Sequence, residues 1–211
     1  MLRDELARVG VVPVITLHEL RHAVPLAEAL CAGGLSVLEV TLRTPVAVAA
    51  IEAMRRAVPG AVVGAGTVVN REQLAAAVGA GSRFLVSPGF SAALAVHARQ
   101  AAVPFLPGVA TPTELLAALE HGLDTLKFFP AEQAGGVAML KALQAPFPAV
   151  AFCPTGGITA QKAPDYLAQP NVVAIGMSSV APPELIAAGD FAAITGLARA
   201  AAALRRRPVS A

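Results

Sequence analysis

The chain has 211 residues, of which 55 % are hydrophobic, 14 % charged and 4 % aromatic, with a formal net charge of +2. This composition is too apolar for a disordered chain, and the small net charge gives no reason to expect nucleic acid as a partner. No apolar stretch reaches about 18 residues without Gly, Pro or a charge, so we expect no membrane span.

The N-terminal segment, MLRDELARVG, has the pattern of a short, charged amphipathic helix. It lacks the apolar central stretch of a secretory signal peptide. Cys31 and Cys153 lie far apart in apolar surroundings, which favours two buried free thiols. We therefore expect a cytoplasmic protein.

Short runs rich in Val and Ile then alternate with Ala- and Leu-rich segments that have helical spacing and often end at Gly. The runs are 11–17, 37–43, 61–67, 83–88, 105–110, 125–130, 151–157 and 172–180. Strands that alternate with helices indicate parallel βαβ units. Eight units without a linker predict an α/β protein, a single (β/α)₈ TIM barrel over residues 1–211. It would carry a short N-terminal helix and a basic C-terminal tail at 205–207.

An open, doubly wound sheet is the alternative fold. It is less favoured, because no G-x-G-x-x-G motif opens a helix in this chain. In a barrel, the chemistry lies at the C-terminal ends of the strands, and successive strand side chains alternate between the helices and the interior. The polar residues that this alternation directs to one interior mouth are Glu39, Thr41, Arg43, Lys127 and Thr155.

Lys127 is the least expected of these, because lysine is almost never buried without a partner. One interpretation is an ion pair with Glu39 that serves only the fold. The other is a Schiff-base nucleophile, for which the apolar setting and inward Arg43 favour the neutral amine. The iminium would then act as an electron sink for carbon–carbon cleavage next to a ketone. Glu39 could move protons and Arg43 could bind a carboxylate.

The segments 154–159 (PTGGIT) and 175–179 (IGMSS) offer Gly amides and hydroxyls where barrels commonly bind phosphate. Tight strand-to-helix turns are the alternative explanation. Thr67 and Pro88 end two further runs, where lining the mouth and simple loop formation are equally good interpretations. The four histidines, His18, His22, His97 and His121, lie outside the strand ends, so we expect neither a metal site nor a cofactor.

Five motifs, VLEVTLRT, VGAGTV, SPGF, KFFPAE and CPTGGI, resemble those of the 2-keto-3-deoxy-6-phosphogluconate (KDPG) and 4-hydroxy-2-oxoglutarate (KHG) aldolases. The match runs in order from VVPVITL to AAGDF. The resemblance implies a metal-independent class I aldolase on a (β/α)₈ barrel, usually a homotrimer. Its expected reaction is the cleavage of KDPG to pyruvate and glyceraldehyde 3-phosphate.

By the same resemblance, Lys127 would form the Schiff base, Glu39 would be the general acid/base acting through a water, and Arg43 would bind the pyruvoyl carboxylate. Positions that match pocket-lining residues are Thr67, Pro88 and Phe129, and Thr155 matches a residue that contacts the sugar hydroxyls. The expected phosphate site consists of Gly156, Gly157 and Ser178.

This chain reads GMSSV at 176–180 where the family usually reads GGSWL, so Met177 replaces a glycine and Ser179 a tryptophan. If Met177 has a negative φ, its N–H is available and the phosphate site is complete. A KHG aldolase acting on unphosphorylated substrate is therefore an alternative function. Two others are an isomerase or epimerase on a phosphate-binding barrel, and a barrel that binds a sugar phosphate without turnover.

Overall fold

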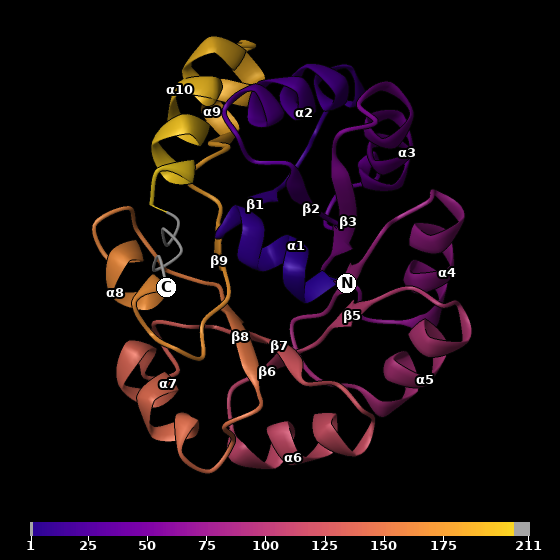
Figure 1. Cartoon of the computed structure of the whole chain (residues 1–211). Coiled ribbons are helices and arrows are strands. Elements are labelled where there is room, and N and C mark those ends of the chain that lie inside the picture. The colour runs from indigo at the N-terminus through magenta and orange to yellow at the C-terminus, as the bar shows by residue number, and fades with distance from the viewer. Residues whose placement is uncertain (1, 205–211) are drawn as a thin grey trace.

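A closed ring of parallel strands, surrounded by helices, forms the centre of the computed structural model, which describes residues 2–204 (Figure 1). The strands are β1 (Val11–Ile15), β2 (Val37–Thr41), β3 (Val62–Gly66), β4 (Leu85–Val86), β5 (Phe105–Leu106), β6 (Gly108–Val109), β7 (Thr125–Phe128), β8 (Ala151–Pro154) and β9 (Ile175–Met177). Six pair in the order β5-β4-β3-β2-β1-β9 and three in the order β6-β7-β8.

Two links close these groups into the predicted (β/α)₈ barrel. β5 and β6 are consecutive parts of one strand run, and a parallel bridge between Thr155 and Gly176 joins the end of β8 to β9. The ring rules out the open, doubly wound sheet that the sequence left as an alternative.

The helices form the outer layer, and several begin at side chains that cap their free N–H groups. They are η1 (Leu20–His22), α2 (Ala23–Ala32), α3 (Ala47–Ala57), α4 (Arg71–Gly79), α5 (Ala92–Gln100), α6 (Pro112–Glu120), α7 (Gly136–Gln144), α8 (Ala163–Leu167), α9 (Pro183–Ala188) and α10 (Phe191–Ala202). Thr111 and Glu114 form a reciprocal capping box at α6. Asn70 and Asp190 accept hydrogen bonds from backbone N–H groups at α4 and α10.

Several strands are shorter than the apolar runs predicted. The fifth run is interrupted at Pro107, which has no N–H to donate to a sheet. The second, sixth and seventh runs end as strands at Thr41, Phe128 and Pro154. Arg43, Phe129 and Thr155 consequently lie just beyond strand ends, in the first residues of the loops at the mouth.

Apolar residues fill the N-terminal half of the barrel. Helix α1 (Leu2–Val9) lies across this end in Figure 1, and its Leu6 and Val9 are buried in the interior cluster. The other buried residues of that cluster lie in the strands or just before them, and they are Val12, Val37, Phe84, Val86, Leu106, Cys153 and Ala174. Leu126, Phe128 and Phe152 point the other way, into the layer between strands and helices, as the alternation predicted. One end is thus closed by apolar packing, which leaves the C-terminal mouth for polar groups.

Glycines on the inner face make room for larger neighbours. A Cβ at Gly64 would lie 2.5 Å from the Phe84 ring, and one at Gly176 would lie 2.3 Å from Thr155 Oγ1. A Cβ at Gly66 would lie 2.3 Å from Glu39 Oε1. The absence of a side chain at position 66 therefore leaves the space that the Glu39 carboxylate occupies inside the barrel.

The basic tail at 205–207 lies outside the described residues. Within residues 2–204, Cys31 and Cys153 are free thiols, half-buried and buried respectively. The helices of this part of the chain are all too short or too polar to cross a membrane.

Candidate active site

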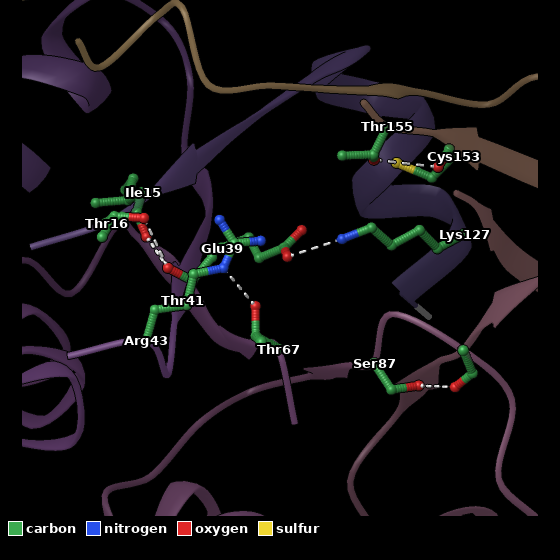
Figure 2. Close-up of polar contacts among 11 residues, drawn as sticks. Ile15, Thr16, Glu39, Thr41, Arg43, Thr67, Ser87, Lys127, Cys153 and Thr155 are labelled. Carbon is green, nitrogen blue, oxygen red and sulfur yellow. Dashed lines mark hydrogen bonds and ion pairs between the residues drawn. The ribbon is translucent and has the colours of Figure 1, made fainter. Parts of the chain in front are cut away.

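Lys127 and Glu39 meet inside the barrel, near its C-terminal mouth. Lys127 Nζ on β7 donates to Glu39 Oε1 on β2 over 3.1 Å, and Figure 2 shows the two side chains pointing toward one another. Their side chains are only 5 % and 4 % exposed. Because two charges lose their hydration here, such a pair is a weak source of stability. Its position at the mouth of a barrel therefore indicates chemistry rather than support of the fold.

Besides Glu39, the neighbours of the Lys127 amine are an aromatic ring and a neutral thiol. The Phe129 ring centroid lies 5.2 Å from Lys127 Nζ. Cys153 is the register partner of Lys127 on β8. Burial, with a smaller contribution from the Glu39 carboxylate, raises the pKa of the Cys153 thiol to about 12. The thiol is therefore neutral at physiological pH and supplies no competing charge beside the lysine.

Arg43 lies at the rim of the same mouth, where its side chain is exposed. Its Nε donates to Thr67 Oγ1 over 3.2 Å (Figure 2). Thr67 has a φ of 59°, a conformation that costs a β-branched residue about 1–3 kcal/mol. The Val68 N–H donates to Val86 O over 3.0 Å and helps to hold this backbone in place. The strained threonine thus orients a guanidinium that can pair with a carboxylate.

Thr41, the inward residue between Glu39 and Arg43, joins the first two strands. Its hydroxyl donates to Ile15 O over 2.9 Å and lies 2.9 Å from Thr16 Oγ1. Thr41 is fully buried, so it positions β2 and cannot itself reach a substrate.

Pro88 occupies an exposed turn just after β4. The buried Ser87 hydroxyl donates to Gly89 O over 2.7 Å and stabilises this turn. A Cβ at Gly108 would lie 2.2 Å from Pro88 O, so the β6 backbone packs directly against it. Pro88 was predicted from the sequence to line the pocket, whereas Ser87, which makes the hydrogen bond, was not predicted.

The expected phosphate residues follow two neighbouring strands, β8 and β9. Gly156 and Gly157, which we call the diglycine turn, have φ values of 109° and 75° that favour glycine. The bridge between Thr155 and Gly176 brings this turn to the strand end that Ser178 follows. Ser178 opens, with Ser179 and Thr16, on a cavity of about 350 Å³. Thr16 was not predicted, and its only sequence signal was its place after the first strand.

Met177 does not disturb this arrangement. It lies in β9 opposite Pro13, and within residues 2–204 only Thr67 and Ala102 are non-glycine residues with positive φ. Its side chain is buried in the layer between strands and helices. The Ile175 N–H donates to Gly10 O over 2.9 Å, so the two-residue repeat of a parallel strand directs the Met177 N–H to β1 as well. The expectation that this N–H would help to bind phosphate is therefore wrong.

His18 lies in the loop after β1, His22 in η1, His97 in α5 and His121 at the end of α6. In the described part of the chain, no three His, Cys, Asp or Glu side chains form a group that could hold a metal ion. A cavity of about 490 Å³ opens at the other end of the barrel, beside Ser82 and Val103. Barrels carry their chemistry at the C-terminal end, so we assign the site to the mouth with Lys127.

A (β/α)₈ barrel with a buried lysine and carboxylate at this mouth is typical of lyases that work through an imine. Residues 2–197 match the aldolase family described as "KDPG and KHG aldolase". The chain is 51 % identical to the KHG/KDPG aldolase of Escherichia coli (strain K12) over 191 residues, which cover 90 % of each protein. It belongs to the KDPG and KHG aldolase family.

Two solved structures are similar to the whole barrel. The KDPG aldolase of Zymomonas mobilis ZM4, crystallised with 3-phosphoglycerate, superposes with a TM-score of 0.91 and 48 % identity, covering 99 % of this chain and 98 % of that one. The KDPG aldolase of Legionella pneumophila superposes with a TM-score of 0.93 and 45 % identity, covering 95 % and 98 %. In the Legionella structure, pyruvate is captured at low pH as a covalent carbinolamine intermediate.

Proposed function

We propose that this protein is a metal-independent class I aldolase that cleaves KDPG to pyruvate and glyceraldehyde 3-phosphate. The observation that carries the proposal is the buried contact between Lys127 Nζ and Glu39 Oε1 at 3.1 Å. A carbinolamine with pyruvate, as in the Legionella relative, requires an amine that can reach the substrate carbonyl. Lys127 supplies such an amine inside the barrel, whereas Lys141 on α7 and Lys162 in the segment after β8 have exposed side chains.

In the first half of the reaction, Glu39 accepts a proton from Lys127 Nζ, which attacks the ketone carbon of the substrate. The carbinolamine hydroxyl leaves as water with a proton returned by Glu39, and an iminium remains. The 3.1 Å contact allows the first transfer to be direct, and a water would carry the second proton from Glu39 to the carbinolamine hydroxyl.

In the second half, Glu39 accepts the proton of the C4 hydroxyl while the C3–C4 bond breaks. The bonding electrons move to the iminium nitrogen, which forms an enamine and releases glyceraldehyde 3-phosphate. Glu39 then returns the proton to C3, and water hydrolyses the resulting iminium to pyruvate and free Lys127. The neutral Cys153 thiol and the Phe129 ring add no second base that would compete with Glu39.

The residues around the pair have distinct binding roles in this proposal. Arg43, oriented by Thr67, binds the substrate carboxylate. Pro88 and Phe129 line the pocket, and the Thr155 hydroxyl contacts the sugar hydroxyls. The diglycine turn and Ser178 bind the phosphate through N–H and O–H groups beyond neighbouring strand ends.

The family includes KHG aldolases, so unphosphorylated 4-hydroxy-2-oxoglutarate is the competing substrate. The positive φ values of both turn glycines and the exposed Ser178 favour the phosphorylated one. An isomerase or epimerase, and a binder without turnover, both predict no covalent adduct with pyruvate. Borohydride reduction in the presence of pyruvate therefore separates both from an aldolase.

We propose a cytoplasmic homotrimer that needs no metal or cofactor. The two free thiols suit a reducing compartment. The homotrimer is what the resemblance to the family implies. The iminium already supplies the electron sink that a metal ion would otherwise provide.

The test is to measure kcat/KM for KDPG and for 4-hydroxy-2-oxoglutarate, with pyruvate release coupled to lactate dehydrogenase. We expect at least tenfold preference for KDPG, about 1.4 kcal/mol, because each charge-assisted hydrogen bond contributes roughly 1.5–3 kcal/mol. Activity should survive exhaustive treatment with EDTA. The absence of pyruvate release from both substrates, or a loss with EDTA that a divalent ion restores, would overturn the proposal.

A further inference from the structure

A cluster of three polar side chains, which the proposed mechanism does not use, lies beside the diglycine turn. Tyr166 OH on α8 donates to Glu132 Oε1 over 2.5 Å, and Lys162 Nζ forms an ion pair with Glu132 Oε2. The three residues come from the loop after β7 and from the segment after β8, 30 to 34 positions apart. We call them the Glu132 cluster.

Glu132 is in direct contact with the diglycine turn. Its N–H donates to Gly156 O over 3.2 Å, and the preceding Ala131 N–H donates to Thr155 O over 2.8 Å. A Cβ at Gly157 would lie 2.8 Å from Glu132 Cγ, so the side chain packs against the bare glycine backbone. Any displacement of Glu132 therefore moves, or releases, the backbone that carries the turn's N–H groups.

The other two residues hold the Glu132 side chain in place, Tyr166 from the buried core and Lys162 from the solvent-exposed side. Tyr166 is 1 % exposed and packs in the main core, so its hydroxyl is a rigid donor. Lys162 is half exposed and balances the charge of a carboxylate that would otherwise repel a nearby phosphate. The hydrogen bond from Lys162, followed by that from Tyr166, lowers the pKa of Glu132, which is therefore ionised at neutral pH.

We propose that Glu132, held by Tyr166 and Lys162, is a positioning residue for phosphate binding. It keeps the diglycine turn in the conformation that presents its N–H groups to the phosphate of the substrate. The inference rests on the proposed function, because it assigns Glu132 to the phosphate end of that same site. A structural role alone would affect phosphorylated and unphosphorylated substrates equally.

The test compares Tyr166→Phe and Glu132→Ala with Glu132→Gln, which keeps an acceptor for the Tyr166 hydroxyl. The readouts are the dissociation constant of 3-phosphoglycerate, kcat and KM for KDPG, and kcat/KM for 4-hydroxy-2-oxoglutarate. Glu52→Gln is the matched control, because it breaks an exposed Glu–Arg pair with Arg56 on α3. Thermal unfolding of each variant shows whether it is folded.

We expect Tyr166→Phe and Glu132→Ala to weaken 3-phosphoglycerate binding and raise KM for KDPG by about tenfold. In both variants, kcat for KDPG and kcat/KM for 4-hydroxy-2-oxoglutarate should change less than about twofold. Glu132→Gln should weaken 3-phosphoglycerate binding less than Glu132→Ala does, and Glu52→Gln should leave this binding unchanged. Unchanged 3-phosphoglycerate binding in the folded variants, or equal losses for both substrates, would overturn the inference. Absence of 3-phosphoglycerate binding in the unmodified protein would instead overturn the phosphate site of the proposed function.

Discussion

Lys127 Nζ and Glu39 Oε1 lie 3.1 Å apart, although the two residues are separated by 88 positions in the chain. One comes from β7 and the other from β2, so only the closed barrel brings them together. In the proposed mechanism, this contact joins the nucleophile to its proton acceptor. Substitutions should consequently distinguish the covalent role of Lys127 from the proton-transfer role of Glu39.

Glu39→Gln should retain adduct formation and lose proton transfer. The amide keeps nearly the size of the carboxylate but cannot accept a proton, and positioned acid–base groups contribute about 10²–10⁴-fold. We expect the exchange of the pyruvate methyl protons, followed by NMR in deuterated water, to slow by that factor. Trapping of pyruvate by borohydride should remain measurable. Exchange at the unmodified rate would remove Glu39 from the proposed role.

Gly66→Ala should displace the Glu39 carboxylate without replacing any residue that takes part in the proposed reaction. Its new Cβ would lie 2.3 Å from Glu39 Oε1, whereas a Cβ at Gly60 would have no heavy atom within 4 Å. We expect Gly66→Ala to lower kcat by at least tenfold, about 1.4 kcal/mol. Gly60→Ala, the matched control, should keep full activity and be equally or more stable. Full activity in folded Gly66→Ala would show that the position of Glu39 is not critical.

Met177→Gly should reduce stability and leave substrate preference nearly unchanged. The methionine side chain fills the layer between strands and helices, and its removal should cost about 2–5 kcal/mol. Because its N–H points to β1, the ratio of kcat/KM for KDPG over 4-hydroxy-2-oxoglutarate should change less than about tenfold. Chemical denaturation and the two kinetic assays measure these quantities. A preference for phosphate that arises only in the glycine variant would contradict the assigned phosphate site.

Cys153 should make the protein less stable in alkaline solution. Burial, with a smaller contribution from Glu39, raises the pKa of its thiol from 9.0 to about 12. The unfolded chain releases this proton near pH 9, while the folded protein still holds it. The stability that this group contributes is therefore fully present below about pH 9. It is lost at roughly 1.4 kcal/mol per pH unit as the pH rises toward 12.

Cys153→Ala should flatten this dependence, which urea unfolding at several pH values between about 8 and 10 would measure. Tyr166, whose pKa burial also raises, remains in both proteins and so cancels in the comparison. If the free energy of unfolding fell equally steeply with pH in both proteins, the Cys153 thiol would not be the source of the alkaline dependence.

Much of the barrel follows from the sequence, because alternating strand and helix runs leave few topologies. The two-residue alternation also directed Glu39 and Lys127 to the interior, where the structure places them. The ends of the strands could not be predicted from the sequence. Apolar residues such as Leu42 continue beyond Thr41, the last residue of β2 that pairs with β3.

Contacts between loops could not be predicted either. The Glu132 cluster depends on the packing of the segments after β7 and β8, and no local pattern connects Glu132 to Tyr166. The positive φ of Thr67 is another such case, because threonine rarely adopts it. These features depend on the tertiary environment rather than on periodicity.

The most direct test of Lys127 as the Schiff-base residue is borohydride reduction in the presence of pyruvate, followed by peptide mass mapping. Three lysines are available as targets, and only Lys127 lies inside the barrel, against Glu39. Lys141 on the surface of α7 and Lys162 serve as internal controls with exposed side chains. We expect a reduced pyruvate adduct on Lys127 and none on Lys141 or Lys162. Lys127→Ala should lose the adduct and about four orders of magnitude in turnover, roughly 5–6 kcal/mol. An adduct on another lysine, no adduct at all, or an active Lys127→Ala variant would contradict it.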